Sequence, residues 1–152
     1  MQETPKHRRF SMIQRNATAQ WTGDLKAGQG SIRLGSGAFE GKYSFGTRFE
    51  GAPGTNPEEL LGAAHAGCFS MALALGLTQA GHVPTRVNTT ATVQMDRVDE
   101  KMTIVGIALV CEAEVPGITN EAFQQVAEAT KGGCIVSRAL ASVPMTLSAT
   151  LK

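Results

Sequence analysis

The sequence has almost no charge excess and few aromatic side chains. Its 14 Lys and Arg residues nearly balance 13 Asp and Glu residues, giving a net charge of +1, and aromatic residues make up 5% of the 152 residues. A chain without a positive field is not drawn to a nucleic-acid backbone, and few rings are available on which bases could stack. The composition therefore argues against a nucleic-acid partner.

Cysteine is also scarce, and no two cysteines form a CxxC pair. Cys68, Cys111 and Cys134 leave one cysteine over in any disulfide pairing, and the ligand spacings typical of zinc sites are missing. The fingerprints of phosphate and dinucleotide binding are absent too, since the chain has only isolated GxG turns. We therefore expect no metal, no cofactor and a reducing, cytoplasmic compartment.

The N-terminal basic residues lack the apolar run that follows them in a secretory signal. Residues 1–16 carry four of these basic side chains: Lys6, Arg8, Arg9 and Arg15. We interpret this stretch as a basic arm. The remaining residues, 17–152, have the length of a single domain, and the 42% apolar content of the chain is enough for a core.

Long hydrophobic runs are limited to residues 60–77, whose length touches the lower limit for a membrane span. The many Ala and Gly residues of this run, the acidic Glu58 and Glu59 at one end and the lack of a second run argue against a span. A helix that is apolar all round is otherwise typical of the buried centre of a fold. We expect a long buried central helix and no membrane partner.

Short alternating stretches separated by glycine precede this run. Residues 17–22, 31–34 and 43–49 alternate polar and apolar side chains, which predicts three strands of an antiparallel meander. Asn56 then offers a helix N-cap and Pro57 a first helical residue, so the long helix is expected to begin there.

The alternation returns after the long helix, which is expected to end near Ala80. Residues 85–98 and 102–115 predict two long strands, and six side chains of the second strand share one face. These six are Val105, Ile107, Leu109, Cys111, Ala113 and Val115. Cys111 is therefore expected to be a small buried hydrophobe rather than a reactive thiol.

Two further helices, over residues 120–131 and 135–141, and a strand over residues 145–151 are expected to complete the chain. This order contains no repeating βαβ unit. It predicts an α+β fold with antiparallel sheets around the long central helix.

The other two cysteines differ in their local surroundings. Cys68 lies in the middle of the apolar helix, where a lone cysteine is typical of core packing. Cys134 follows Gly132 and Gly133 and precedes a short helix, where free backbone N–H groups and the helix dipole favour a thiolate. His65 lies one turn before Cys68, so a Cys–His nucleophile pair is also possible.

Four blocks of the sequence resemble the OsmC/Ohr family, and specifically its osmotically inducible protein C branch. The blocks are TRFEG at residues 47–51, GTNPEEL at 54–60, AAHAGCFSMA at 63–72 and GCIVS at 133–137. One departure is Ile135, which stands where the family usually has proline after its second cysteine.

The resemblance implies a thiol-dependent peroxidase that reduces organic hydroperoxides to alcohols and works as an intertwined homodimer. Cys68 would be the peroxidatic cysteine, and Cys134 would resolve its sulfenic acid into a Cys68–Cys134 disulfide. Arg48 would keep the thiolate ionised and stabilise the leaving alkoxide, and Glu58 would hold the guanidinium. A dithiol, such as a lipoylated protein, would serve as the reductant.

The spacing of Glu58 and Cys68 indicates that each site is shared between two chains. Ten residues along one straight helix span about 15 Å, far more than an ion pair bridges. Two antiparallel helices around a two-fold axis could bring Glu58 of one chain beside Cys68 of the other. A helix broken at Gly62 or Gly67 would be the alternative.

Two other functions compete with peroxide reduction. Cys68 and His65 could form the nucleophile pair of a hydrolase or acyltransferase. The chain could also be a non-catalytic module whose apolar pocket holds a lipid or another small molecule.

Overall fold

In the computed structural model, which describes residues 11–152, the chain forms two units that divide between Thr55 and Asn56. The predicted basic arm lies mostly outside the described residues, as do three of its basic side chains, Lys6, Arg8 and Arg9. The single domain expected over residues 17–152 stays a prediction.

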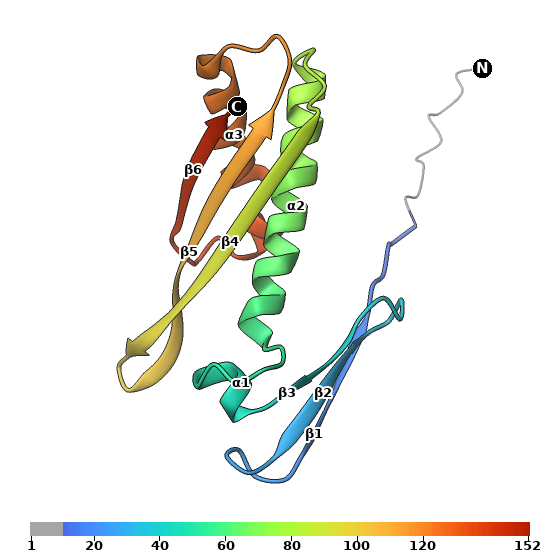
Figure 1. Ribbon diagram of the computed structural model, residues 1–152, viewed down its shortest axis with the longest axis vertical. Coiled ribbons are helices and arrows are strands. Elements are labelled where there is room, and N and C mark those ends of the chain that lie inside the picture. The colour runs from blue at the N-terminus through green and yellow to red at the C-terminus, as the bar shows by residue number, and fades with distance from the viewer. Residues whose placement is uncertain (1–10) are drawn as a thin grey trace, which may run out of the picture. The chain divides into compact units, whose positions relative to one another are not determined.

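The first unit contains a three-stranded antiparallel sheet in the order β1-β2-β3, which confirms a meander and its first two strands but not the third (Figure 1). Its strands are β1 (Ala17–Thr22), β2 (Gln29–Leu34) and β3 (Glu40–Tyr43). Gly30 of β2 pairs with Trp21 on one side and Tyr43 on the other. A Cβ at Gly30 would lie 2.5 Å from the Tyr43 ring, so only glycine fits beneath the two aromatic rings.

The strand expected over residues 43–49 is wrong, because the chain leaves the sheet at Tyr43 and forms helix α1 (Phe45–Phe49). The reason is a capping box. Ser44 Oγ accepts a hydrogen bond from the Thr47 N–H at 3.2 Å, and Thr47 Oγ1 accepts one from the Ser44 N–H at 2.8 Å. The apolar alternation that favours a strand also suits a helix turn, in which Phe45 and Phe49 stack with centroids 5.0 Å apart.

The second unit begins with helix α2 (Pro57–Gln79), which starts and ends as the sequence predicts. Asn56 is the N-cap, and its side-chain oxygen accepts a hydrogen bond from the Glu59 N–H at 2.8 Å. Gly81, just past the helix, has a φ of 90°, the left-handed conformation that favours glycine at this position.

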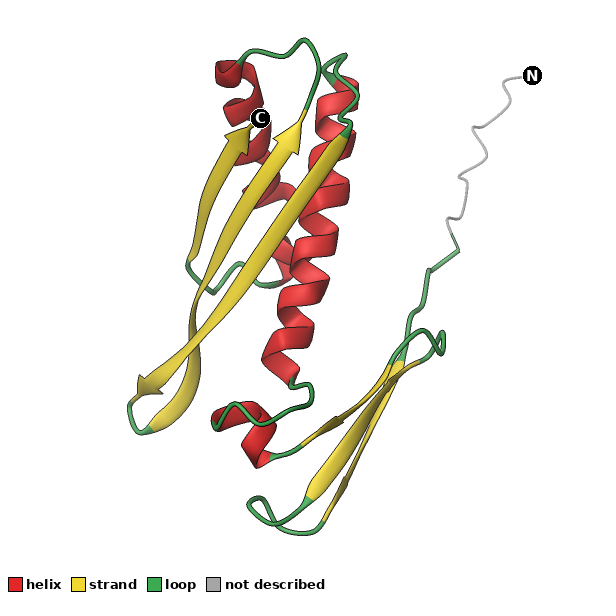
Figure 2. Cartoon of the chain, in the orientation of Figure 1, coloured by secondary structure: helices red, strands yellow, loops and turns green. Residues whose placement is uncertain are grey.

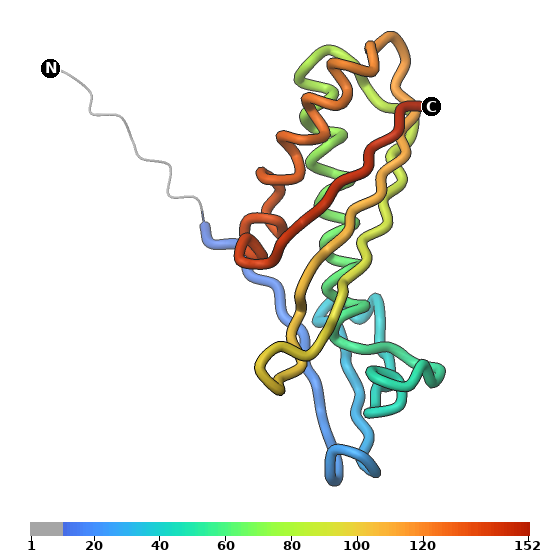
Figure 3. The backbone as a smooth tube through the Cα atoms, turned by 90° about the vertical axis from the view of Figure 1, so that its left-hand side faces the viewer, coloured from blue at the N-terminus to red at the C-terminus, as the bar shows by residue number. Residues whose placement is uncertain are grey.

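The sheet of the second unit has the order β4-β5-β6, with strands β4 (Arg86–Val98), β5 (Lys101–Glu114) and β6 (Met145–Leu151). β4 and β5 pair antiparallel, but β5 and β6 are parallel, and their arrows point the same way in Figure 2. The expectation of purely antiparallel sheets is therefore wrong for this pair. Helices α3 (Asn120–Gly133) and α4 (Ile135–Ala139) form the crossover that a parallel pair needs, which Figure 3 traces from β5 to β6.

The core lies between this sheet and the helices α2 and α3. Phe69, Leu73 and Leu77 of α2 and Phe123 of α3 pack with one face of β5. The alternate side chains from Ile107 to Val115 are buried on that face, as predicted, and Cys111 among them is fully buried. Val105 is the exception, since the register shift between Gln94 and Met95 makes it the extra residue of a β-bulge and leaves it 37% exposed.

Helix α2 is buried along one side only, which corrects the expectation of a helix buried all round. The sheet, α3 and α4 cover the side of Phe69 and Leu73, while Met71 and Leu75 on the other side are 78% and 59% exposed. By length and composition α2 could cross a membrane. Its packing against β4, α3 and α4 instead fits the core-helix interpretation.

Candidate functional site

Cys68 lies at the border between the buried and the exposed sides of α2. Its side chain is half-buried and packs against the core cluster, while the neighbouring Gly67 is exposed. A thiol in this position is held by the core and is still open to a small reactant. The neighbourhood is apolar, with Ala72 also packed against the cluster.

Cys134 lies directly before α4. It is 3% exposed, belongs to the same core cluster and serves as the N-cap, with its Sγ accepting a hydrogen bond from the Ser137 N–H at 3.3 Å. The helix begins at Ile135 without the proline of the related motif, and the Ile135 side chain is 77% exposed. The cap interaction satisfies one of the free N–H groups at this helix start.

The structure thus brings Cys68 and Cys134 into one region of the second unit. Cys68 packs against the cluster that contains Cys134, and α2 contacts α4. Both residues are free thiols, as is Cys111. Their roles in chemistry stay predictions.

Ser137 is a polar residue of this region that sequence reasoning missed. Its hydroxyl accepts a hydrogen bond from Cys134 Sγ at 3.0 Å and lies 2.7 Å from Nε2 of His65. All three side chains are buried, and His65 is fully so. The available clue was the serine three residues after a helix-capping cysteine, but nothing in the sequence linked it to His65.

His65 does not make the contact that a Cys68–His65 nucleophile pair needs. Its Nε2 is hydrogen-bonded with Ser137, and within residues 11–152 no hydrogen bond joins it to Cys68. Burial lowers the pKa of the imidazole from its ordinary value of 6.5. His65 is therefore neutral near pH 7.

Arg48 belongs to the first unit, in the last turn of α1. Its guanidinium lies over the ring of Phe49, with Cζ 5.3 Å from the ring centroid. The side chain lines a cavity of about 250 Å³ whose walls include the aromatic rings of Trp21, Tyr43 and Phe45. Sequence reasoning did not find this cavity, because its residues come from β1, β3 and α1.

Glu58 lies in the first turn of α2 and is only 7% exposed. A carboxylate is favourable there because the first turn of a helix has free N–H groups and a partial positive charge. The helix runs without a break through Gly62 and Gly67, so Glu58 and Cys68 of one chain stay ten residues, or about 15 Å, apart along it.

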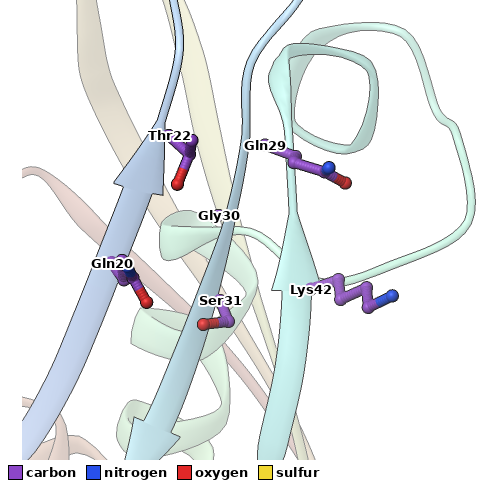
Figure 4. A pocket seen from close by; sticks show the side chains of 6 residues that line it. All are labelled: Gln20, Thr22, Gln29, Gly30, Ser31 and Lys42. Carbon is purple, nitrogen blue, oxygen red and sulfur yellow. The ribbon is translucent and has the colours of Figure 1, made fainter.

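A second cavity, also of about 250 Å³, lies over β1, β2 and β3. Figure 4 shows that it is lined by polar side chains from all three strands, among them Gln20, Ser31 and Lys42. It contains none of the four candidate site residues. Among the described residues, no group of three or more His, Cys, Asp or Glu side chains is arranged to hold a metal ion.

A family model described as OsmC-like protein matches residues 49–148. The chain belongs to the OsmC-like family. This OsmC-like protein is 50% identical over 129 residues to the peroxiredoxin OsmC of Escherichia coli K12 and to that of Shigella flexneri. The match covers 84% of the chain and 90% of each relative, and it confirms the predicted family.

Solved structures share the fold. An organic hydroperoxide resistance protein from Elizabethkingia anophelis superposes with a TM-score of 0.74 at 24% identity, covering 94% of this chain and 99% of its own. An OsmC-like protein from Mycoplasma pneumoniae superposes with a TM-score of 0.72 at 14% identity, covering 91% and 97%. These likenesses confirm the α+β class of the OsmC-like protein.

Proposed function

We propose that this protein reduces organic hydroperoxides to alcohols with Cys68 and Cys134 as its two working thiols. Its membership of the OsmC-like family and its 50% identity to peroxiredoxins support a thiol-dependent peroxidase with an antioxidant role. The two-thiol mechanism is supported by the packing of Cys68 against the buried cluster containing Cys134, together with the contact between α2 and α4, the helix that Cys134 caps.

The first step is attack by the Cys68 thiolate on the outer oxygen of the hydroperoxide. The O–O bond breaks, Cys68 becomes a sulfenic acid, and the alkoxide takes a proton to leave as the alcohol. We assign to Arg48 the stabilisation of the thiolate and of the alkoxide charge, and to Glu58 the holding of the guanidinium. A nearly buried carboxylate at Glu58 is consistent with that role.

The second step is attack by Cys134 on the sulfenic sulfur of Cys68. A disulfide forms, and the hydroxyl of the sulfenic acid leaves as water. A dithiol reductant, such as a lipoylated protein, then restores both thiols by exchange. Three free thiols in one chain fit a reducing, cytoplasmic compartment.

The peroxidase relatives imply a hydroperoxide substrate, and the aromatic cavity beside Arg48 supports the organic class. Rings of Trp21, Tyr43 and Phe45 offer apolar surface that an alkyl or aryl group can cover. Hydrogen peroxide has no such group and gains nothing from this surface.

The homodimer with shared sites is supported by the uncovered side of α2. An unbroken helix keeps Glu58 about 15 Å from Cys68 of its own chain, so a site that uses both draws them from two chains. The uncovered side has small or apolar residues at Ala64, Gly67 and Met71. A Cβ at Gly67 would meet no described atom within 4 Å, which leaves room for a second helix.

The test is a thiol count and an intact mass after one equivalent of cumene hydroperoxide. Two thiols per chain should be lost, the mass should fall by two hydrogens, and peptide mapping should find Cys68 joined to Cys134 with Cys111 still free. A protein that keeps all three thiols, or that loses Cys111, would contradict the proposal. Retention of all three thiols would favour the binding module, since the hydrolase lacks a His65–Cys68 hydrogen bond in residues 11–152, whereas loss of Cys111 would assign the chemistry to another thiol.

A further inference from the structure

A buried chain of three polar side chains connects α2 with the start of α4. Cys134 Sγ donates to Ser137 Oγ at 3.0 Å, and Ser137 Oγ lies 2.7 Å from His65 Nε2. Both contacts lie inside the second unit, and the three residues are at most 3% exposed. The peroxidase mechanism described above uses only the first of these residues.

The direction of the hydrogen bonds among these three side chains follows from the number of protons that each donor atom carries. A serine hydroxyl carries one proton, so a Ser137 Oγ that accepts from the Cys134 thiol has its own proton to donate. His65 Nε2 lies 2.7 Å from this hydroxyl, and we assign to it the role of acceptor, with the imidazole proton on Nδ1. Along the three side chains the hydrogen bonds run S–H to O–H to N, from Cys134 toward His65.

His65 is in the protonation state that this arrangement requires. Burial lowers the pKa of its imidazole from 6.5, so the ring is neutral and Nε2 can accept a proton near pH 7. Nδ1 is buried and has no hydrogen-bond partner among the described residues. A buried nitrogen without a partner costs stability, and packing alone would be better served by an apolar side chain.

We propose that His65 and Ser137 form a proton relay that deprotonates Cys134 for its attack on the Cys68 sulfenic acid. This assignment rests on the proposed function, because it concerns the second step of that mechanism. Neither residue touches the substrate, so both are positioning residues that act through Cys134.

The step balances in atoms and charge. Ser137 Oγ takes the thiol proton of Cys134 as its own proton passes to His65 Nε2, which leaves a thiolate and an imidazolium. The thiolate sulfur bonds to the Cys68 sulfur, the S–O bond breaks, and the oxygen leaves as hydroxide. The proton gained by His65 balances the one that hydroxide takes up to become water, so one disulfide and one water result.

The Ser137 N–H supports the thiolate as it forms. This backbone group donates to Cys134 Sγ at 3.3 Å and needs no movement to do so. Since it belongs to the backbone, it remains when the Ser137 side chain is changed. The contribution of the hydroxyl can therefore be separated from that of the helix cap.

The two steps are measured separately by rapid quenching after one equivalent of cumene hydroperoxide. Release of cumyl alcohol reports the first step, and formation of the Cys68–Cys134 disulfide reports the second. Dimedone added to the quench traps the Cys68 sulfenic acid that has not yet reacted. Circular dichroism before each experiment identifies variants that are folded.

Ser137→Ala and His65→Gln break the relay at different points. Glutamine still accepts a hydrogen bond at its amide oxygen but does not hold a proton near pH 7. Each change should slow disulfide formation by roughly 10²- to 10⁴-fold, the range expected for loss of a general base, with cumyl alcohol release within about twofold of wild type. The dimedone adduct of Cys68 should rise in proportion.

Ser137→Thr and Thr130→Val are the matched controls. Ser137→Thr keeps a hydroxyl and should restore disulfide formation to within about threefold of wild type. Thr130 is a buried hydroxyl of α3 that donates to the Val126 carbonyl, so Thr130→Val removes a buried hydroxyl outside the relay. It should leave both steps unchanged.

Two results would overturn the relay. One is disulfide formation at the wild-type rate in Ser137→Ala or His65→Gln. The other is an equal slowing of both steps, which indicates a distorted site rather than a lost proton path. If the wild-type protein itself releases no cumyl alcohol, the proposed function fails and the relay fails with it.

Discussion

Two buried cysteines of the second unit lie in different kinds of secondary structure and have different hydrogen-bond partners. Cys111 and Cys134 are 0% and 3% exposed and belong to one core cluster. Cys111 lies within β5, opposite Thr89 of β4, and burial raises the pKa of its thiol. The side-chain hydrogen bond with Thr89 opposes this shift, and the nearby Glu112 carboxylate adds to it.

The polar contacts of Cys134 lie at the start of a helix, whereas the hydrogen bond of Cys111 with Thr89 lies within a sheet. A strand uses its backbone N–H and C=O groups in the sheet, whereas the first N–H groups of a helix remain available to a side chain. Cys134 takes such a group from Ser137 and reaches His65 through the Ser137 hydroxyl. We therefore expect the two thiols to differ in reactivity although both are buried, because only Cys134 is connected to a histidine through a hydroxyl.

The largest expected effect comes from Cys68, without which Cys134 has no sulfenic acid to attack. Cys68→Ser should lower kcat/KM for cumene hydroperoxide by roughly 10³-fold or more, since it removes the nucleophile. The measurement is steady-state turnover with a dithiol reductant. Substantial turnover by Cys68→Ser would show that another group reduces the peroxide.

Cys134→Ser should separate the two steps. The first equivalent of hydroperoxide should still be reduced, but the Cys68 sulfenic acid should persist and be over-oxidised by further hydroperoxide. Mass spectrometry should find a dimedone adduct on Cys68 after one equivalent, and two added oxygens after a large excess. Full turnover without over-oxidation would assign the second thiol to another residue.

The preference among hydroperoxides tests the aromatic cavity beside Arg48. Apolar surface covered by a cumyl group should raise kcat/KM over that for hydrogen peroxide by about 10²-fold. Trp21→Ala should reduce this ratio, because Trp21 is one wall of the cavity. Equal efficiency toward both peroxides would contradict a role for apolar surface.

Mixed subunits test whether Cys68 works with groups of a second chain. Cys68→Ser and Arg48→Ala homodimers should each be nearly inactive, but a heterodimer of the two retains one intact combination. After the two variants are refolded together, each heterodimer should have about half the activity of a wild-type dimer. Purified heterodimers, isolated with two different tags, that stay inactive would rule out the shared site.

The smallest effect is expected at Cys111. Cys111→Ser should leave kcat/KM within about twofold of wild type and lower the melting temperature by a few degrees, because a more polar group is buried in the core. Steady-state kinetics and thermal unfolding measure the two quantities. A large loss of activity would mean that the strand cysteine shares in the chemistry and that the contrast with Cys134 is wrong.

Much of the fold follows from local sequence features. Asn56 and Pro57 begin α2 where expected, and the alternation around Cys111 correctly predicts a buried face in β5. Helix α1 was missed because Phe45 and Phe49 suit both a strand and a helix turn, and the Ser44 cap decides between them. Val105 was misplaced because a β-bulge reverses the side-chain alternation without a mark in the sequence.

What the sequence alone determined is the set of thiols and their local environments. The cap residues, the glycines and the periodicity of apolar side chains act over a few neighbours, and they place Cys68 in a helix, Cys111 in a strand and Cys134 at a helix start. The tertiary structure alone decided that β6 lies parallel to β5 and that one side of α2 stays uncovered. It also joined His65 to Ser137 across 72 residues of sequence. Contacts at such separations depend on how whole elements pack, and no local pattern encodes them.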